Sequence, residues 1–388
     1  MIKGIKRMLH SRFYTAQLFY LLLFTQFAGM MRQAGIGKYI IFGIFLIPLL
    51  LSDHQSIRPK SLCILIPPAV FVLLGLVSCA ASSFFNSFTL KTVLLLLFPA
   101  IFAIVLHEKG SIEGIDICRT VFVGYLLYNI LFFYSFHIAE STRSFPFGAF
   151  FIFFFLKKDW SFCLMAAALC VFTQKRIALL GMIAVLCLII VVMALIKFSR
   201  IKMKTLWTAG SAIGIAAAYA IAGMTHTGKL IELFGLIGFD PTGRQTIWKA
   251  ARPFGAFHVF YTGNGLGFVV SKLDEMRVWM RDSFWFTSLH SDFYVGLLEL
   301  GFIGFGVWIA SYFWSYNKLT EDSDDNPAIK LFAFCAIAYT FILYITDNTL
   351  VYFEYWFPLN LMLLDMAFSR TSDKKKQTIL LESRHSHD

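Results

Sequence analysis

The sequence predicts an all-α integral membrane protein with about twelve transmembrane helices and one long extracytoplasmic loop between the ninth and tenth helices. Of the 388 residues, 58% are hydrophobic and 15% are charged, whereas a soluble domain carries about 25% charged residues. Apolar runs long enough to cross a bilayer recur along the chain. The net charge is +11, but the basic residues gather in short segments between these runs. That pattern is typical of membrane orientation and not of nucleic-acid binding.

The first apolar run follows Lys3, Lys6, Arg7 and Arg12, which is also how a signal peptide begins. No convincing cleavage site of small residues follows, and further runs come at once, so we expect an uncleaved span. The second, sixth and seventh of the about twelve predicted spans are short. The spans are 15–31, 39–51, 62–81, 89–106, 115–136, 144–156, 160–172, 177–196, 205–224, 291–312, 329–346 and 350–368.

The orientation follows from the Lys and Arg residues. The N-terminus, the loop 197–204 and the tail after residue 368 are all basic, which predicts that they lie in the cytoplasm. An even number of spans agrees with this, and it places the loop 225–290 outside. The predicted organisation is therefore helices one to nine in 1–224, the outer loop in 225–290, helices ten to twelve in 291–368, and a cytoplasmic tail in 369–388.

Arg176 lies at the outer start of the eighth run, against the positive-inside bias. A helix N-terminus adds positive potential there, which favours an anion. The alternative is an arginine that only extends to the interface, and both interpretations remain open. For the neighbouring Lys175, a short loop that tolerates one exposed cation is a sufficient explanation.

The outer loop is longer than a simple connection requires. Asp240-Pro241 predicts the N-cap and first residue of a helix. Arg244 then falls in its first turn, and Trp248 and Arg252 follow at four-residue steps on the same face. Pro253 ends or bends this helix. Because it is amphipathic and aromatic, it is suited to lying on the membrane surface or roofing a cavity.

The segment Gly263-Asn-Gly-Leu-Gly267 lacks the Gly-Lys-Ser/Thr of a phosphate-binding loop and the spacing of a dinucleotide-binding loop. We interpret it as a flexible turn in preference to a ligand contact.

Ser291 is the predicted N-cap of the tenth helix, and this places His290 at its outer mouth. A histidine there is either an interfacial polar residue or a general base, and the arginine at 244 keeps the catalytic interpretation open. Glu299 lies further along the same helix. A carboxylate within a membrane is costly, so a partner or a function is expected for it. The rise of about 13 Å between the two residues makes a direct contact with His290 unexpected.

No metal or cofactor site is predicted. The seven cysteines all fall in apolar runs without a Cys-x-x-Cys motif, as packing residues do. Asp322-Ser-Asp324 resembles the metal-binding pair of nucleotide-sugar transferases in spacing only. A solvated charge run is the better interpretation, because no soluble domain surrounds it.

Several of these motifs together resemble a known signature. They are Thr242-Gly243-Arg244 with Trp248, the glycine turn, and His290-Ser-Asp292 with Leu298-Glu299-Leu300-Gly301-x-x-Gly304. In this order, after an arginine outside the eighth span, they resemble the signature of the bacterial O-antigen polymerase and O-antigen ligase superfamily. The motif-bearing part is 174–304.

The resemblance implies a GT-C-like enzyme of the bacterial inner membrane that transfers a glycan from undecaprenyl diphosphate to a hydroxyl, without a metal or a nucleotide sugar. It implies that Arg176 and Arg244 bind the donor diphosphate and that His290 deprotonates or orients the acceptor hydroxyl, with Glu299, Trp248 and Asp292 in support. The implied partners are the undecaprenyl diphosphate-linked oligosaccharide, membrane lipid and, as a candidate, a chain-length regulator, with no nucleic acid. The chemistry agrees, because arginines stabilise a leaving diphosphate and a neutral histidine accepts a proton.

Polymerases and ligases share this chemistry and differ in acceptor. A polymerase extends the chain onto the next lipid-linked repeat unit, and a ligase transfers it to lipid A-core. The segment Asp347-Asn-Thr-Leu-Val-Tyr-Phe-Glu-Tyr-Trp-Phe-Pro resembles polymerases slightly more, so a polymerase is favoured and a ligase is the alternative. A third alternative, a transporter or flippase, lacks the Gly-x-x-x-Asp-Arg motif of major facilitator proteins and does not explain the long outer loop.

Overall fold

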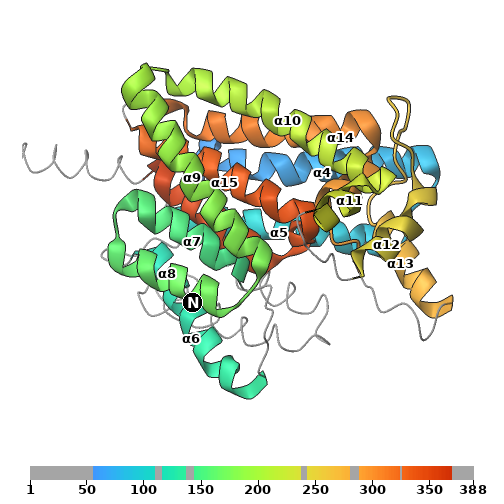
Figure 1. Cartoon of the computed structure of the whole chain (residues 1–388), viewed down its shortest axis with the longest axis horizontal. Helices are drawn as coiled ribbons and strands as arrows, with labels where there is room; N and C mark the ends of the chain where they lie inside the picture. Colours follow the sequence, from blue (N-terminus) through green and yellow to red (C-terminus); the bar gives the residue numbers. More distant parts are fainter. Residues whose placement is uncertain are drawn as a thin grey trace, which may run out of the picture.

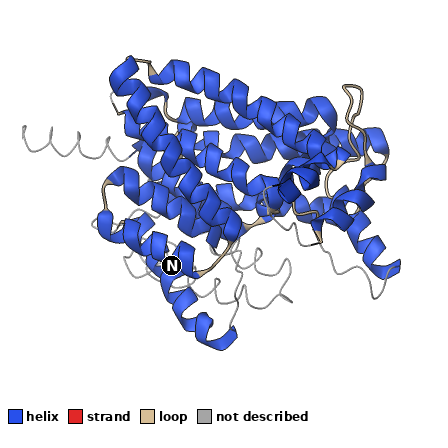
Figure 2. Cartoon of the chain, in the orientation of Figure 1, coloured by secondary structure: helices blue, strands red, loops and turns tan. Residues whose placement is uncertain are grey.

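A computed structural model of the chain describes residues 56–109, 116–136, 144–236, 243–279, 288–323 and 326–368. Over these residues the chain forms helices joined by short connections, and they contain no strand (Figure 2). The predicted spans 15–31 and 39–51, the tail 369–388, and the predicted helix start at Asp240-Pro241 lie outside the described residues. The all-α fold class is thus confirmed for the described part of the chain.

Each predicted span from 62–81 onward coincides with a helix. These helices are α4 (Ile66–Ser82, preceded by the 3-10 helix η2, Pro59–Leu65), α5 (Ser87–Lys109), α6 (Ile117–Phe136), α7 (Ser144–Lys157), α8 (Trp160–Phe172), α9 (Arg176–Ser199), α10 (Met203–Thr227), α14 (Asp292–Leu319), α15 (Pro327–Thr346) and a last helix at 353–368. The outer loop contributes α11 (Lys229–Leu236), α12 (Arg244–Ala251), η3 (Arg252–Phe254) and α13 (Phe268–Trp279). Two short 3-10 helices complete the described elements, η4 (Glu321–Ser323) and η5 (Thr349–Val351).

Within the described residues, 6 helices are long and apolar enough to cross a membrane, namely the continuous η2–α4 segment, α5, α9, α10, α14 and α15. The composition and these helices together are those of a multi-pass membrane protein. The helices α7 and α8 are apolar but shorter, as their short predicted spans implied.

Local chemistry explains where several helices begin and end. Asn326 accepts a hydrogen bond from the backbone N–H of Ala328, and Pro327 occupies the first position of α15. The helix α10 ends at Gly228, whose φ of 89° glycine adopts without a Cβ penalty.

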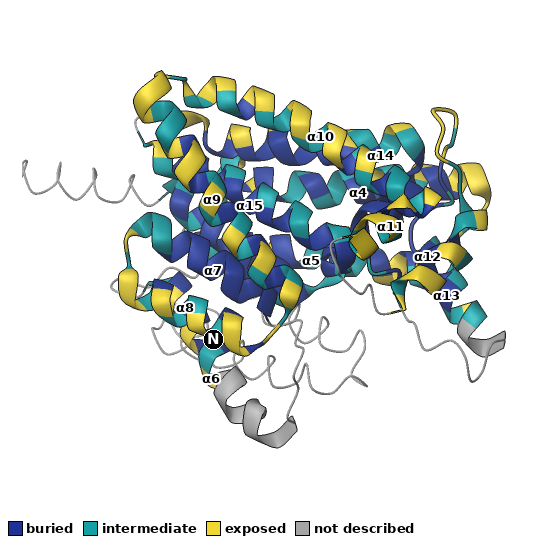
Figure 3. Ribbon diagram, viewed as in Figure 1, coloured by how far each residue is buried: buried dark blue, intermediate teal, exposed yellow. Residues whose placement is uncertain are grey.

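The long helices lie side by side, with α14 between α10 and α4 and in contact with α15 (Figure 1). In α14 and α15, 61% of the apolar window is buried inside the protein, compared with 28% in α9 and 22% in α10. Figure 3 shows the same contrast as dark central helices and yellow outer faces. Because these outer faces are apolar, they are suited to contact lipid.

The helix α14 is broken at Gly301, where φ is 76° and ψ is −179°. The loop 261–267 from the segment before α13 is inserted at the break and replaces the missing helical bonds. The N–H of Asn264 donates to Leu298 O at 3.0 Å, the N–H of Gly265 donates to Glu299 O at 3.0 Å, and the N–H of Phe302 donates to Tyr261 O at 2.8 Å. The exchange leaves the backbone groups around the buried Gly301 paired.

The glycine turn is therefore not the flexible turn that the sequence suggested. Gly263, Gly265 and Gly267 are buried and all have a positive φ. A Cβ atom on Gly263 would lie 2.5 Å from Glu299 O, and one on Gly267 would lie 2.8 Å from Phe88 C. Glycine is needed here because the loop passes directly against other backbone.

Polar contacts join helix ends in two separate groups. One group consists of the pairs Arg58–Glu108, Lys60–Asp322, Arg119–Asp159 and Lys157–Asp365. The other consists of Ser82–Asn264, Ser144–Thr173, Lys175–Asp347 and Arg244–Thr346. In every pair, both members lie in segments that the predicted spans assign to the same side of the membrane. The second group lies at the end of the bundle where α11, α12 and α13 gather (Figure 1).

Candidate functional site

The helix α12 covers the start of α14 and is fixed there by Trp248. The indole of Trp248 is fully buried, and its Nε1–H donates to Leu289 O at 2.8 Å. The described helix begins at Arg244, after Gly243 in the left-handed region (φ 76°). Arg244 therefore lies in the first turn of a helix, as predicted, but this helix begins three residues after Pro241, the predicted first helical residue, because Gly243 is left-handed. The predicted end or bend at Pro253 coincides with η3.

His290 lies directly before Ser291, which occupies the predicted N-cap position of α14, although its hydroxyl makes no capping bond. The backbone of His290 has a φ of 51°, in the left-handed region, where residues other than glycine are strained. Its Nε2 lies 3.2 Å from Ser288 Oγ. Its Nδ1 is buried and has no hydrogen-bond partner among the described residues, so one ring nitrogen is unused by the fold.

Three charged side chains act on His290. Burial lowers the pKa of His290 below its ordinary value of 6.5, Asp347 raises that pKa, and Arg244 and Lys175 lower it. Burial dominates because a charged imidazole loses hydration there. The imidazole is therefore neutral near neutral pH and retains a lone pair that can accept a proton.

Asp347 connects the elements around this histidine. Its side chain is 1% exposed, and its Oδ2 lies 2.9 Å from Lys175 Nζ at the start of α9. The backbone oxygen of Asp347 accepts from the N–H of Asp292 at 3.2 Å. The Nε–H of Arg244 donates to Thr346 O at 3.1 Å. The starts of α9, α12 and α14 and the end of α15 thus converge on one place.

Asp292 has a positioning role in the structure. It is buried, and its Oδ2 accepts from the N–H of Leu350 at 2.8 Å and from the hydroxyl of Thr349 at 3.2 Å. These bonds hold η5, which follows Asp347, against the first turn of α14.

The structure brings Arg244 close to His290, and it places Arg176 at the start of α9 next to Lys175. Arg176 is the first residue of α9, as the sequence suggested, and its side chain is exposed. Among the described residues, the cations that act on His290 are Arg244 and Lys175. The role of Arg176 in diphosphate binding stays a prediction. Lys175 is not the exposed cation that its short loop suggests, because it forms an ion pair with the buried Asp347.

Glu299 has the partner that a buried carboxylate requires, and that partner is not His290. It is 2% exposed, and its Oε1 accepts from the backbone N–H of Val269 at 3.2 Å, in the first turn of α13. A carboxylate at this position compensates the unpaired N–H groups of a helix start. Glu299 therefore anchors α13 and the inserted loop to α14.

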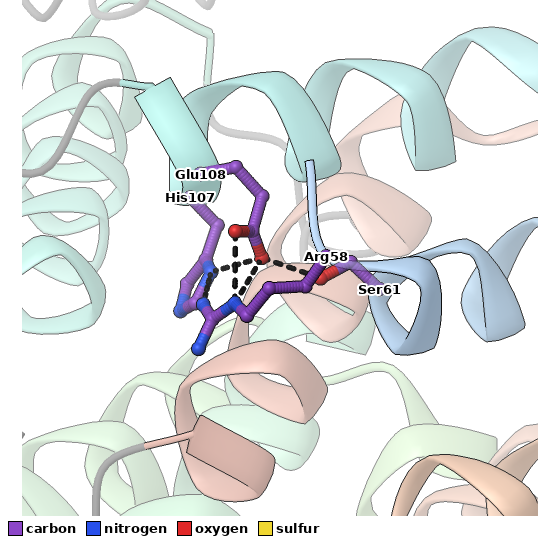
Figure 4. Close-up of polar contacts among 4 residues, drawn as sticks. All are labelled: Arg58, Ser61, His107 and Glu108. Atoms are coloured by element: carbon purple, nitrogen blue, oxygen red, sulfur yellow. Dashed lines mark hydrogen bonds and ion pairs between the residues drawn. The ribbon is translucent and has the colours of Figure 1, made fainter. Parts of the chain in front are cut away.

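A second buried carboxylate, Glu108, lies in the other group of helix-end contacts (Figure 4). Arg58 Nε donates to both of its oxygens at 2.9 and 3.1 Å, Ser61 Oγ donates to Oε1, and His107 Nδ1 lies 3.4 Å away. The Arg58 guanidinium also lies 3.5 Å from the ring centroid of Phe368. These contacts pair Glu108 of α5 with Ser61 of η2 and with Arg58, and Arg58 also contacts Phe368 of the last helix. The cluster therefore joins η2, α5 and the last helix.

Among the described residues, no group of three or more His, Cys, Asp or Glu side chains could hold a metal ion. The acidic segment after α14 is solvated, as its composition suggested. Asp322 pairs with Lys60 and is 80% exposed, and Glu321 lies 2.6 Å from Lys318. Asp324 lies outside the described residues.

Comparison of the chain with protein-family models, curated proteins and solved structures finds no match. Functional inference therefore depends on the site itself. That site combines a neutral imidazole, two nearby cations and a buried carboxylate at one end of an apolar bundle. This combination can accept a proton and stabilise a developing negative charge.

Proposed function

We propose that this protein is an O-antigen or surface polysaccharide polymerase of the bacterial inner membrane, within the O-antigen polymerase and ligase superfamily that its motifs resemble. It transfers a glycan chain from undecaprenyl diphosphate to a hydroxyl of the next lipid-linked repeat unit, on the outer face of the membrane. The observation that carries this proposal is the unpartnered Nδ1 of a neutral His290 beside Arg244 and Lys175.

The proposed step is a single displacement at the anomeric carbon of the donor. The acceptor oxygen forms a bond to this carbon, and the bond from the carbon to the diphosphate oxygen breaks. The electron pair of the broken bond goes to the diphosphate, and the hydroxyl proton goes to His290. No oxidant, nucleotide or covalent enzyme intermediate is required.

The cations serve the leaving group in this proposal. Arg244 and Lys175 lie near the histidine, and Arg176 adds a further cation at the start of α9. Charge-assisted hydrogen bonds from guanidinium groups to phosphate are short and strong. Because these cations are in place before the reaction, they stabilise the diphosphate as its charge develops.

An apolar bundle suits this chemistry because both substrates are lipid-linked. The long apolar helices give the polyprenyl chains a bilayer to lie in. The cluster lies at the end of the bundle, where the diphosphate of a membrane lipid would be found. A ligase would perform the same step with lipid A-core as acceptor.

The test separates the histidine from the arginines. Purified variants are given lipid-linked donor in excess chelator, because the proposed step uses no divalent metal. His290→Ala is expected to bind donor nearly normally and to lose roughly 100-fold or more in rate, the scale of general-base catalysis. Arg244→Ala and Arg176→Ala are expected to weaken donor binding, each by about 1.5–3 kcal/mol. Lysine at either position should restore binding only in part, because it lacks the bidentate fork.

Lys249→Ala is the matched control, since Lys249 is an exposed cation of α12, and it should behave like the unmodified protein. A histidine variant that loses donor affinity, together with arginine variants that keep it, would refute the assigned roles. Absence of glycan transfer by the unmodified protein, with transport of the lipid-linked glycan instead, would favour a flippase.

A further inference from the structure

Arg252 follows α12 and is an arginine that the proposed step does not use. It begins η3. Its Nε is buried and has no hydrogen-bond partner among the described residues. A guanidinium nitrogen that gives up water without gaining a partner is costly, so an additional ligand is expected at this position.

Two polar side chains, His226 and Tyr294, lie near Arg252. His226, near the end of α10, has its Nδ1 3.0 Å from the hydroxyl of Tyr294 in α14. Both side chains lie close enough to Arg252 for an electrostatic interaction. A Cβ on Gly228 would overlap the Arg252 guanidinium. The glycine that ends α10 therefore makes room for this cation.

Two residues of this cluster lie next in the chain to elements that contribute to the site around His290. The helix α12 contributes Arg244 to one cluster and is followed directly by Arg252 of the other. The start of α14 contributes His290 to the first cluster and Tyr294 to the second. Eight residues of helix separate the two arginines, which corresponds to about 12 Å.

The second cluster also adjoins an apolar surface. Just after η3, Phe257, Val259 and Phe260 are 39%, 48% and 86% exposed. The ring of Phe257 packs against Gly223 of α10, which lies one turn before His226. A Cβ on Gly223 would lie 2.9 Å from Cζ of this ring. Exposed aromatic and aliphatic side chains beside a membrane helix are suited to insert among lipid chains.

Arg252 also lies at the C-terminus of α10, where a cation interacts favourably with the helix dipole. That interaction accounts for the charge of Arg252 but leaves its Nε unpaired. It also gives no role to the exposed apolar segment that follows. The experiment below includes a readout on which the two explanations differ.

We propose that Arg252, His226 and Tyr294 form a second phosphate-binding site, which holds the diphosphate of the lipid-linked acceptor while the acceptor's glycan extends toward His290. This inference rests on the proposed function. A polymerase must hold two diphosphate-linked substrates at once, whereas transfer to lipid A-core requires only one. Two cationic clusters, one of them beside an apolar edge, meet the first requirement.

Binding stoichiometry tests the second site. The full-length protein in phosphatidylcholine nanodiscs is titrated with undecaprenyl diphosphate that carries no sugar. Two bound equivalents per chain are expected, and one in Arg252→Gln. In transfer assays, Arg252→Gln should raise the KM for the acceptor by about 10- to 100-fold, the range expected for a lost charge-assisted bond, with donor binding unchanged. Arg252→Lys should restore part of this loss, and Lys249→Ala should retain two equivalents.

Inorganic pyrophosphate carries the same anion without the lipid, and it should compete only weakly. Competition as strong as that of the lipid would assign the site to a free anion and overturn the acceptor assignment. An Arg252→Gln variant that melts earlier but still binds two equivalents would show that the arginine only stabilises the end of α10.

The two proposals can fail separately. One equivalent in the unmodified protein, with transfer intact and lost in His290→Ala, would overturn the second site alone. Two equivalents in the unmodified protein that fall to one in Arg252→Gln would support the second site, whether or not glycan transfer is measured. An absence of glycan transfer together with this result would overturn the proposed function alone.

Discussion

At the scale of single residues, the site depends on keeping one histidine neutral among charged groups. Burial and the two cations Arg244 and Lys175 oppose the protonation of His290, and Asp347 favours it. Lys175 and Asp347 form an ion pair, although Lys175 lowers the pKa of His290 and Asp347 raises it. Removing any one of these charges therefore has a predictable sign.

The pH profile of kcat/KM tests this balance. The proposed step requires a neutral imidazole, and since the pKa of His290 is lowered, transfer should persist down to a pH below 6.5. Arg244→Ala removes a cation that lowers the pKa, so the acid limb should move to higher pH. Asp347→Asn removes the anion that raises the pKa, so the limb should move to lower pH. Arg176→Ala should leave the limb in place. Shifts in the opposite directions would contradict the assignment of His290 as the base.

Stability should follow the same titration. Because the folded-state pKa of His290 lies below its unfolded value of 6.5, the unfolded chain binds a proton that the folded chain does not. The contribution of this residue to stability is therefore complete above pH 6.5 and decreases as the pH falls through that value.

At the scale of elements, the break in α14 decides how the outer loop is attached. The helix is interrupted at Gly301, the loop 261–267 pairs with the freed backbone, and Glu299 holds the start of α13. The start of α14, directly after His290, is thus joined to the outer loop a few residues further along the same helix.

Gly301→Ala tests this attachment. A Cβ there would overlap the backbone of Tyr261 and Thr262, and the φ of 76° is strained for alanine. Strain of this kind costs about 1–3 kcal/mol before the overlap is counted, so the unfolding midpoint in nanodiscs should fall and transfer activity with it. Gly304→Ala is the control, because its Cβ would meet only side-chain atoms, Leu300 Cβ at 3.2 Å and Leu74 Cβ and Cδ1 at 3.9 Å. Equal effects of the two substitutions would argue against a special role for the break.

At the scale of the whole molecule, two groups of polar contacts lie at the helix ends of an apolar bundle. The proposed function requires that the group containing His290 lies outside the cytoplasm. The basic loop 197–204, between α9 and α10, belongs to the opposite side by the predicted topology.

Reporter fusions test this orientation. A reporter that is active only outside the cytoplasm should be active when fused after Gly235 in α11 and inactive when fused after Lys202. Lys202 precedes α10 and Gly235 follows it, so a single span separates the two positions. The reverse pattern would place His290 in the cytoplasm and refute the proposed site of transfer.

The sequence by itself determined the long apolar helices of the described part, the membrane character and the residues that begin several of these helices. Helix length and apolar composition are local properties, and so are the start of α9 at Arg176, the N-cap at Ser291 and the position of Arg244 in a first turn. These depend on a few neighbouring residues and can be derived from their order along the chain.

Only the tertiary structure decided which of these residues meet. The pairing of Lys175 with Asp347, the contact of α13 with Glu299, and the insertion of the glycine loop at Gly301 join segments that are far apart in the sequence. The same is true of Arg252 with His226 and Tyr294. Such contacts depend on how the helices pack against one another, and packing arises from the fit of many side chains at once, which no local pattern of residues encodes.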